Sequence, residues 1–109
     1  MAYSEELAGR MRNALAAHPE IVERKMFGGM AFMLRGNMCC GTLGDDVMVR
    51  VGPDGYEEAL GEPHVREIDF TGRPMRGMVH VEASGVTSDE DLAAWIDRGV
   101  EFALTLPPK

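Results

Sequence analysis

The stretch RKMFGGMAFMLRGNMCCGT, residues 24–42, decides the fold of this chain. It contains two apolar runs, the glycine pair Gly28-Gly29, a Gly-containing turn signal at 35–37 and both cysteines. Short apolar runs bounded by Gly and Asn are typical of buried strands joined by a hairpin. We expect one strand over 21–34 with a bend or bulge at the glycines, paired with a second strand over 38–43.

Hydrophobic periodicity on either side of this stretch predicts further helices and strands. Leu7, Met11 and Leu15 recur at the spacing of one helix face, whereas Val47 and Val49 alternate with other side chains as in a strand. The sequence therefore predicts an α+β domain of order α-β-β-β-α-β-β-α with a five-stranded sheet. The expected elements are a helix capped by Ser4 and stopped by His18-Pro19, strands over 21–34, 38–43 and 47–51, a short helix over 56–60, strands over 65–70 and 78–82, and a helix capped by Ser88 with an apolar stripe over 92–104.

Length and charge bound the class of protein. The 109 residues suit a single domain over 1–109 with one core. The net charge is -7, whereas a protein that binds nucleic acid through its phosphates needs a surplus of Lys and Arg on the contacting face. The sequence has no run of about 20 apolar residues, which a membrane span requires, and its start lacks the layout of a secretory signal. We expect a cytoplasmic domain with no membrane association and no direct binding of nucleic acid.

Side chains able to hold a metal ion or to act as a nucleophile are few and poorly spaced. Cys39 and Cys40 are neighbours, which we expect to point to opposite faces of a strand, and no spaced pair of ligands accompanies His64 or His80. We therefore expect no metal site and buried, free thiols. An enzyme is the alternative, and it would require His80, Arg50 and a cysteine to meet in a concave site.

The acidic and glycine-rich motifs have structural explanations. Asp45-Asp46 suits a turn, and the acidic run at 89–91 suits the first turn of a helix. Gly28-Gly29 lacks the spacing of a dinucleotide fingerprint and the Gly-Lys-Ser/Thr ending of a P-loop. We expect no catalytic residue, no cofactor-binding residue and no cofactor.

Methionines are concentrated in the predicted sheet. Seven of the nine lie there, and the period of two along a strand cannot send all of them to a single face. Three helices are expected to cover one face of the sheet, which leaves methionines on the other, where flexible apolar side chains suit contact with another surface. A bulge at the glycines that resets the alternation is the other explanation. The expected surface for a protein partner or a second copy consists of Met30, Met33, Met38, Met48 and Met78.

Arginines surround a Gly- and Pro-containing loop near the predicted fifth strand. Arg66, Arg73 and Arg76 flank this loop, and local positive patches occur on acidic proteins. These three residues form a candidate anion-binding site. A small-ligand or anion-binding domain is therefore a second functional hypothesis.

Taken together, several segments resemble the TfoX/Sxy N-terminal domain family of bacterial competence regulators. They are Lys25-Met26-Phe27-Gly28-Gly29 after a first helix, Leu34-Arg35-Gly36-Asn37-Met38, Pro74-Met75-Arg76-Gly77 before the last strand, and the closing segment 92–109 with Trp95. The resemblance covers nearly the whole chain.

The resemblance implies a two-layer α/β sandwich with an antiparallel sheet, like that of the secretion-chaperone-like folds. It also implies a non-enzymatic transcriptional co-regulator of DNA-uptake genes that acts with another transcription activator as its protein partner. The chain ends at Lys109 without the C-terminal domain of the two-domain members, so we expect a stand-alone N-terminal domain.

Overall fold

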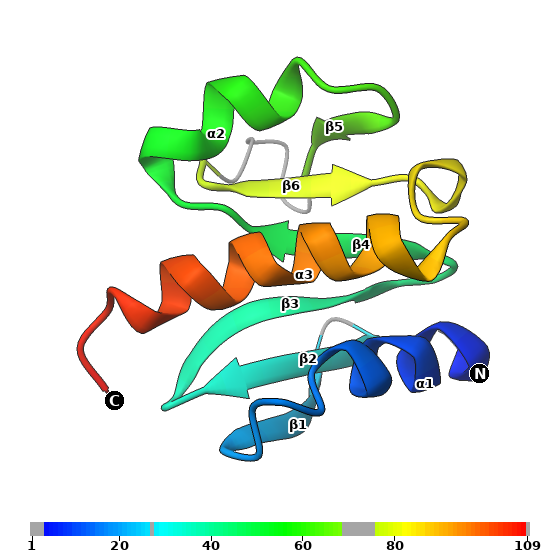
Figure 1. The fold of residues 1–109 in the computed structure, drawn as a ribbon. Coiled ribbons are helices and arrows are strands. Elements are labelled where there is room, and N and C mark those ends of the chain that lie inside the picture. The colour runs from blue at the N-terminus through cyan, green and yellow to red at the C-terminus, as the bar shows by residue number, and fades with distance from the viewer. Residues whose placement is uncertain (1–3, 27, 69–75, 109) are drawn as a thin grey trace.

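A six-stranded antiparallel sheet forms one layer of the fold, and three helices form the other (Figure 1). The computed structural model describes residues 4–26, 28–68 and 76–108. The strand order is β1-β2-β3-β4-β6-β5. The elements are α1 (Glu5–Ala14), β1 (Ile21–Met26), β2 (Gly29–Leu34), β3 (Asn37–Leu43), β4 (Asp46–Arg50), α2 (Pro53–Leu60), β5 (Val65–Glu67), β6 (Met78–Val81), a 3-10 turn (Ala83–Gly85) and α3 (Asp89–Leu104).

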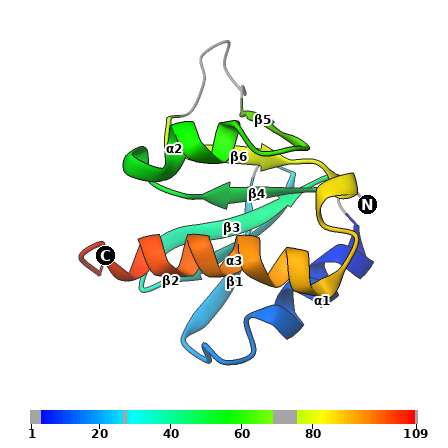
Figure 2. The same ribbon diagram turned by 45° about the horizontal axis from the view of Figure 1, so that its top comes forward.

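The helices lie on one face of the sheet, with α3 between α1 and α2 (Figures 1 and 2). Side chains from all three helices share one apolar core, the helix-side cluster, with inward-facing residues of the strands, for example Met11, Tyr56 and Ile96 with Phe32 and Val79. Among the described helices, none has both the length and the apolar character needed to cross a membrane. The expectation of an α+β fold with an antiparallel sheet and three helices is confirmed.

The helix caps follow the sequence. Ser4 Oγ accepts a hydrogen bond from the backbone amide of Leu7 at 3.1 Å, and Ser88 Oγ accepts one from the amide of Asp91 at 3.0 Å. Each hydroxyl satisfies one of the amides that a helix leaves unpaired in its first turn. The two longer helices therefore begin where their local sequence predicts.

The prediction of five strands is wrong, because the segment 21–34 forms two antiparallel strands. Met26 of β1 pairs with Gly29 of β2, so the chain reverses at the glycines instead of bending. Gly28 has φ +75°, a left-handed conformation that other residues adopt only with strain. Gly29 is required for another reason, since a Cβ there would lie 2.6 Å from Thr42 Oγ1.

The other strand predictions differ only at their ends. Residues 35 and 36 form the turn between β2 and β3, and both have positive φ, as a type I′ hairpin turn requires. The fifth predicted strand, 65–70, is observed as β5 up to Glu67, and Phe70 lies outside the described residues.

A β-bulge in β3 overturns the expectation for the cysteines. Phe32 pairs with Cys40 while Met33 pairs with Met38, so β3 contains one extra residue, Cys39, at this point. Both cysteines consequently belong to the helix-side cluster, and their Sγ atoms are 3.8 Å apart. The expectation that they point to opposite faces is wrong because the bulge interrupts the alternation.

Candidate functional site

The helix-free face of the sheet carries a second apolar cluster. Its buried members are Ala31, Met38, Met48, Ile68 and Met78, with Met26, Met33 and Leu43 half-buried at its border; we call this set the helix-free cluster. No helical residue that the structure describes belongs to it. Four of the five methionines predicted to form a partner surface, Met33, Met38, Met48 and Met78, therefore share one face.

Met30 does not belong to this surface. It lies in the helix-side cluster, because it is one position out of phase with Ala31 along β2. Three of the remaining four are also more buried than the prediction implied, with Met48 only 1% exposed and Met38 and Met78 both 8% exposed. The accessible part of the face is its border at β1 and β2, where Val22 is 62% exposed and stands opposite Met33.

A polar cluster borders the same face at β4, β6 and β5. His80 Nε2 lies 2.8 Å from Asp46 Oδ2, and Asp46 Oδ1 accepts a hydrogen bond from the backbone amide of Ala83 at 2.8 Å. His80 stands directly opposite Met48 on one side and Arg66 on the other. Asp46 thus ties the start of β4 to the 3-10 turn that leads into α3, which is a structural role.

The polar cluster changes the pKa of the Asp46 carboxyl group. Partial burial raises its pKa, but the hydrogen bonds from His80 and from the Ala83 amide outweigh burial, so the pKa lies below the ordinary value. A carboxyl group with a lowered pKa in the folded state stabilises the fold above its unfolded pKa, which is about 3.9 for Asp. This stabilisation is lost as the pH falls through the lower, folded pKa.

We expect Asp46→Asn to weaken the dependence of stability on pH below about pH 4, because the variant has no proton to take up at this position. Urea unfolding at a series of pH values measures it. Asp97→Asn, at an exposed position of α3, is the matched control. If the free energy of unfolding falls equally steeply below about pH 4 in the two variants, the role assigned to Asp46 is contradicted.

Two of the three arginines predicted to bind an anion, Arg66 and Arg76, face a carboxylate. Arg66 Nη2 lies 4.0 Å from Glu82 Oε2, and Arg76 Nη2 lies 3.9 Å from Glu57 Oε1. Arg73 lies outside the described residues. A carboxylate beside the guanidinium of Arg66 and of Arg76 competes with an incoming anion, so the geometry at these two residues does not favour an anion site.

The residues that an enzyme would require are held apart. The cysteines lie under the helices, whereas His80 stands beside Met48 on the helix-free face. The contact with the Cys39 thiol and complete burial raise the pKa of Cys40 well above its ordinary value, so this thiol stays protonated. Among the described residues, no group of three or more His, Cys, Asp or Glu side chains is placed to hold a metal ion.

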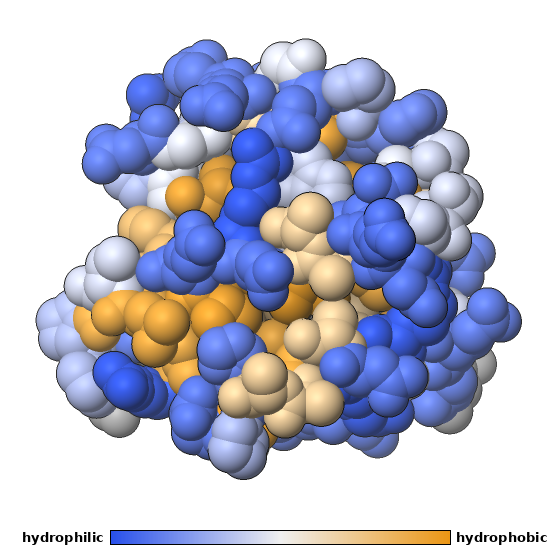
Figure 3. Space-filling model, viewed as in Figure 1, coloured by the Kyte–Doolittle hydropathy of each residue, from blue (hydrophilic) through white to orange (hydrophobic). Residues whose placement is uncertain are grey.

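Sequence reasoning missed a groove between α2 and α3, visible as a hollow in the surface of the helix side (Figure 3). It consists of two adjoining hollows of about 300 and about 390 Å³ that share Arg98. The first lies between α3 and the segment that follows α2, and the second lies between α2 and the C-terminal half of α3. We call the two together the α2–α3 groove. It depends on how two distant helices pack, for which the sequence has no local signal.

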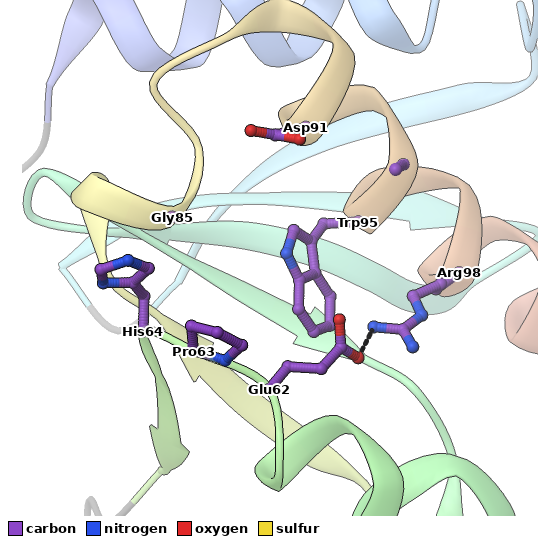
Figure 4. A pocket seen from close by; sticks show the side chains of 8 residues that line it. Glu62, Pro63, His64, Gly85, Asp91, Trp95 and Arg98 are labelled. Atoms are coloured by element: carbon purple, nitrogen blue, oxygen red, sulfur yellow. Dashed lines mark ion pairs between the residues drawn. The ribbon is translucent and has the colours of Figure 1, made fainter.

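An ion pair crosses this groove. Arg98 Nη1 lies 2.6 Å from Glu62 Oε2, and the guanidinium of Arg98 stands 4.3 Å from the ring centroid of Trp95 (Figure 4). The buried Oε2 of Glu62 has no hydrogen bond of good geometry within the described part of the chain, so the charge of Arg98 is what compensates it. Figure 4 shows His64 and Pro63 across the first hollow from α3.

The family model of the TfoX N-terminal domain matches residues 13–103. No curated protein and no solved structure matches the chain. The matched range runs from the end of α1 to the end of α3 and includes all six strands.

Proposed function

Since the chain belongs to the TfoX N-terminal domain family, we propose that it is a regulatory domain that binds a protein partner and carries out no reaction of its own. The partner proposed from the family resemblance is a transcription activator, and binding takes place in the cytoplasm. The separation of His80 from the two thiols supports a role in binding over a role in catalysis.

The observation that carries this proposal is the exposed apolar border of the helix-free cluster. Val22, the second residue of β1, is 62% exposed and pairs with the half-buried Met33 of β2. β1 is at the edge of the sheet, so one side of its backbone pairs with no other described strand. A partner segment can add to such an edge through backbone hydrogen bonds while its side chains contact an apolar border.

A photo-crosslinking amino acid at position 22 tests this proposal in the cells that produce the protein. We expect a covalent adduct with a transcription activator, identified by mass spectrometry, and we expect the adduct to be lost when Met33→Asp is added. The matched control carries the crosslinker at Leu104, which is 44% exposed and belongs to α3, in the helix layer.

Equal adducts from positions 22 and 104, or an adduct at 22 that survives Met33→Asp, would contradict a specific site at this border. An adduct with twice the mass of the chain would identify a second copy as the occupant. Light scattering of the purified protein then distinguishes a stable homodimer from a monomer.

A further inference from the structure

The α2–α3 groove has an aromatic ring in each of its two hollows. Trp95 lines the first and Phe102 lines the second, seven positions apart on α3. Seven residues are two helical turns, which separate the rings by about 10 Å along the helix axis. Trp95 is 8% exposed and Phe102 is half-buried, so each hollow has an aromatic ring in its wall, and the two rings stand at a fixed spacing.

Unpaired carboxylates stand beside both rings. Asp91 lines the first hollow, and Glu58 and Glu101 line the second. All three are exposed, and their side chains form no ion pair with the described residues. Together with Glu62, they give the groove more acidic than basic side chains.

The basic side chains at the groove are already engaged. Arg98 is paired with Glu62 and stacked on Trp95, and the guanidinium of Arg50 stands 5.4 Å from the centroid of the Phe102 ring. Each ring thus already contacts a guanidinium from the chain itself. These contacts already occupy part of each ring, so an incoming cationic side chain is held mainly by the exposed carboxylates of Asp91, Glu58 and Glu101.

We propose that the α2–α3 groove binds a basic segment of a protein partner, which places one cationic side chain in each hollow, on either side of the Arg98–Glu62 ion pair. The groove opens to solvent on the helix side (Figure 3), so a peptide segment can lie along it. In a polyproline II segment, arginines three positions apart lie on the same face and are about 9 Å apart, which is close to the spacing of the rings. This surface is in the helix layer and does not depend on the border proposed above.

The chain's single tryptophan makes this proposal directly measurable, because Trp95 lies in the groove. The probe is a capped octapeptide, Ala-Ala-Arg-Ala-Ala-Arg-Ala-Ala, titrated into the full chain while tryptophan emission is recorded. We expect a saturable change, and at least tenfold weaker binding of the same peptide with citrulline in place of arginine. Citrulline keeps the shape of the side chain and removes its charge.

A charge-matched pair of variants localises the binding. Glu58→Gln/Glu101→Gln is expected to weaken binding of the arginine peptide about tenfold or more. Glu5→Gln/Glu6→Gln removes the same charge from α1, which α3 separates from the groove, and is expected to leave binding unchanged (Figure 1). Thermal unfolding of each variant verifies that it is folded.

Four results would overturn the proposal. They are no emission change with the arginine peptide, equal binding of the citrulline peptide, equal weakening by both double variants, and binding of 1,4-diaminobutane as tight as that of the arginine peptide. The third would indicate a general attraction to an acidic protein, and the fourth would assign the groove to a small diamine.

Discussion

Gly99→Ala is expected to destabilise the domain by about 2–3 kcal/mol, although alanine is the better helix former. Gly99 is where α3 lies against the bulge in β3. A Cβ at this position would fall on the carbonyl oxygen of Cys39, 3.1 Å from its carbonyl carbon and 3.4 Å from Val49 Cγ1. Two of these three atoms belong to the backbone of a paired strand, so α3 must move away from the sheet.

Gly9→Ala is the matched control for this prediction. Gly9 is also inside a helix, α1, but a Cβ there would meet nothing within 4 Å. The substitution is expected to stabilise the domain by about 0.5–1 kcal/mol, because only the helix preference changes. Urea unfolding followed by circular dichroism measures both variants. A Gly99→Ala variant at least as stable as the unsubstituted chain would show that α3 does not depend on this close approach.

The features that sequence predicted well are those set by neighbouring residues. Ser4 and Ser88 cap the helices that follow them, and the Gly36 turn joins β2 to β3 where expected. These structures depend on hydrogen bonds and backbone angles within a few residues. Local sequence is therefore sufficient to place them.

The features that sequence missed depend on contacts between distant segments. A glycine pair is compatible with a bend and with a chain reversal, and Gly28 forms the reversal because β1 pairs with β2. The bulge at Cys39 packs against Gly99, which lies 60 positions further along the chain and has no Cβ to clash with the Cys39 carbonyl group. No local pattern connects two such positions.

The methionine surface was predicted only in part for the same reason. The expected surface included both Met30 and Met33, which alternation along β2 places on opposite faces, because alternation does not indicate which of the two faces the helices. Burial of Met48 depends on side chains from neighbouring strands of the sheet. The α2–α3 groove likewise depends on the packing of helices that are separated in the sequence by two strands.

Met48→Ala is expected to cost about 2–4 kcal/mol of unfolding free energy, although no described helix covers this side chain. Met48 is 1% exposed, and its pairing partner Gly41 provides the space it occupies, since a Cβ at Gly41 would lie 3.2 Å from Met48 Cε. Met33→Ala, at the half-buried border, is expected to cost less than about 1 kcal/mol, because solvent already reaches that side chain. Urea unfolding of both variants makes the comparison.

The ratio of these two losses of unfolding free energy shows which part of the helix-free face a partner can reach. A large cost at Met48 and a small one at Met33 mean that the centre of the cluster holds the sheet together, so a partner reaches only the border at Val22 and Met33. Crosslinking from position 22 should then survive Met48→Leu, which keeps the apolar volume, and fail with Met33→Asp. Two small and equal costs would mean that the whole face is accessible, and Met38, Met48 and Met78 would then return to the partner surface.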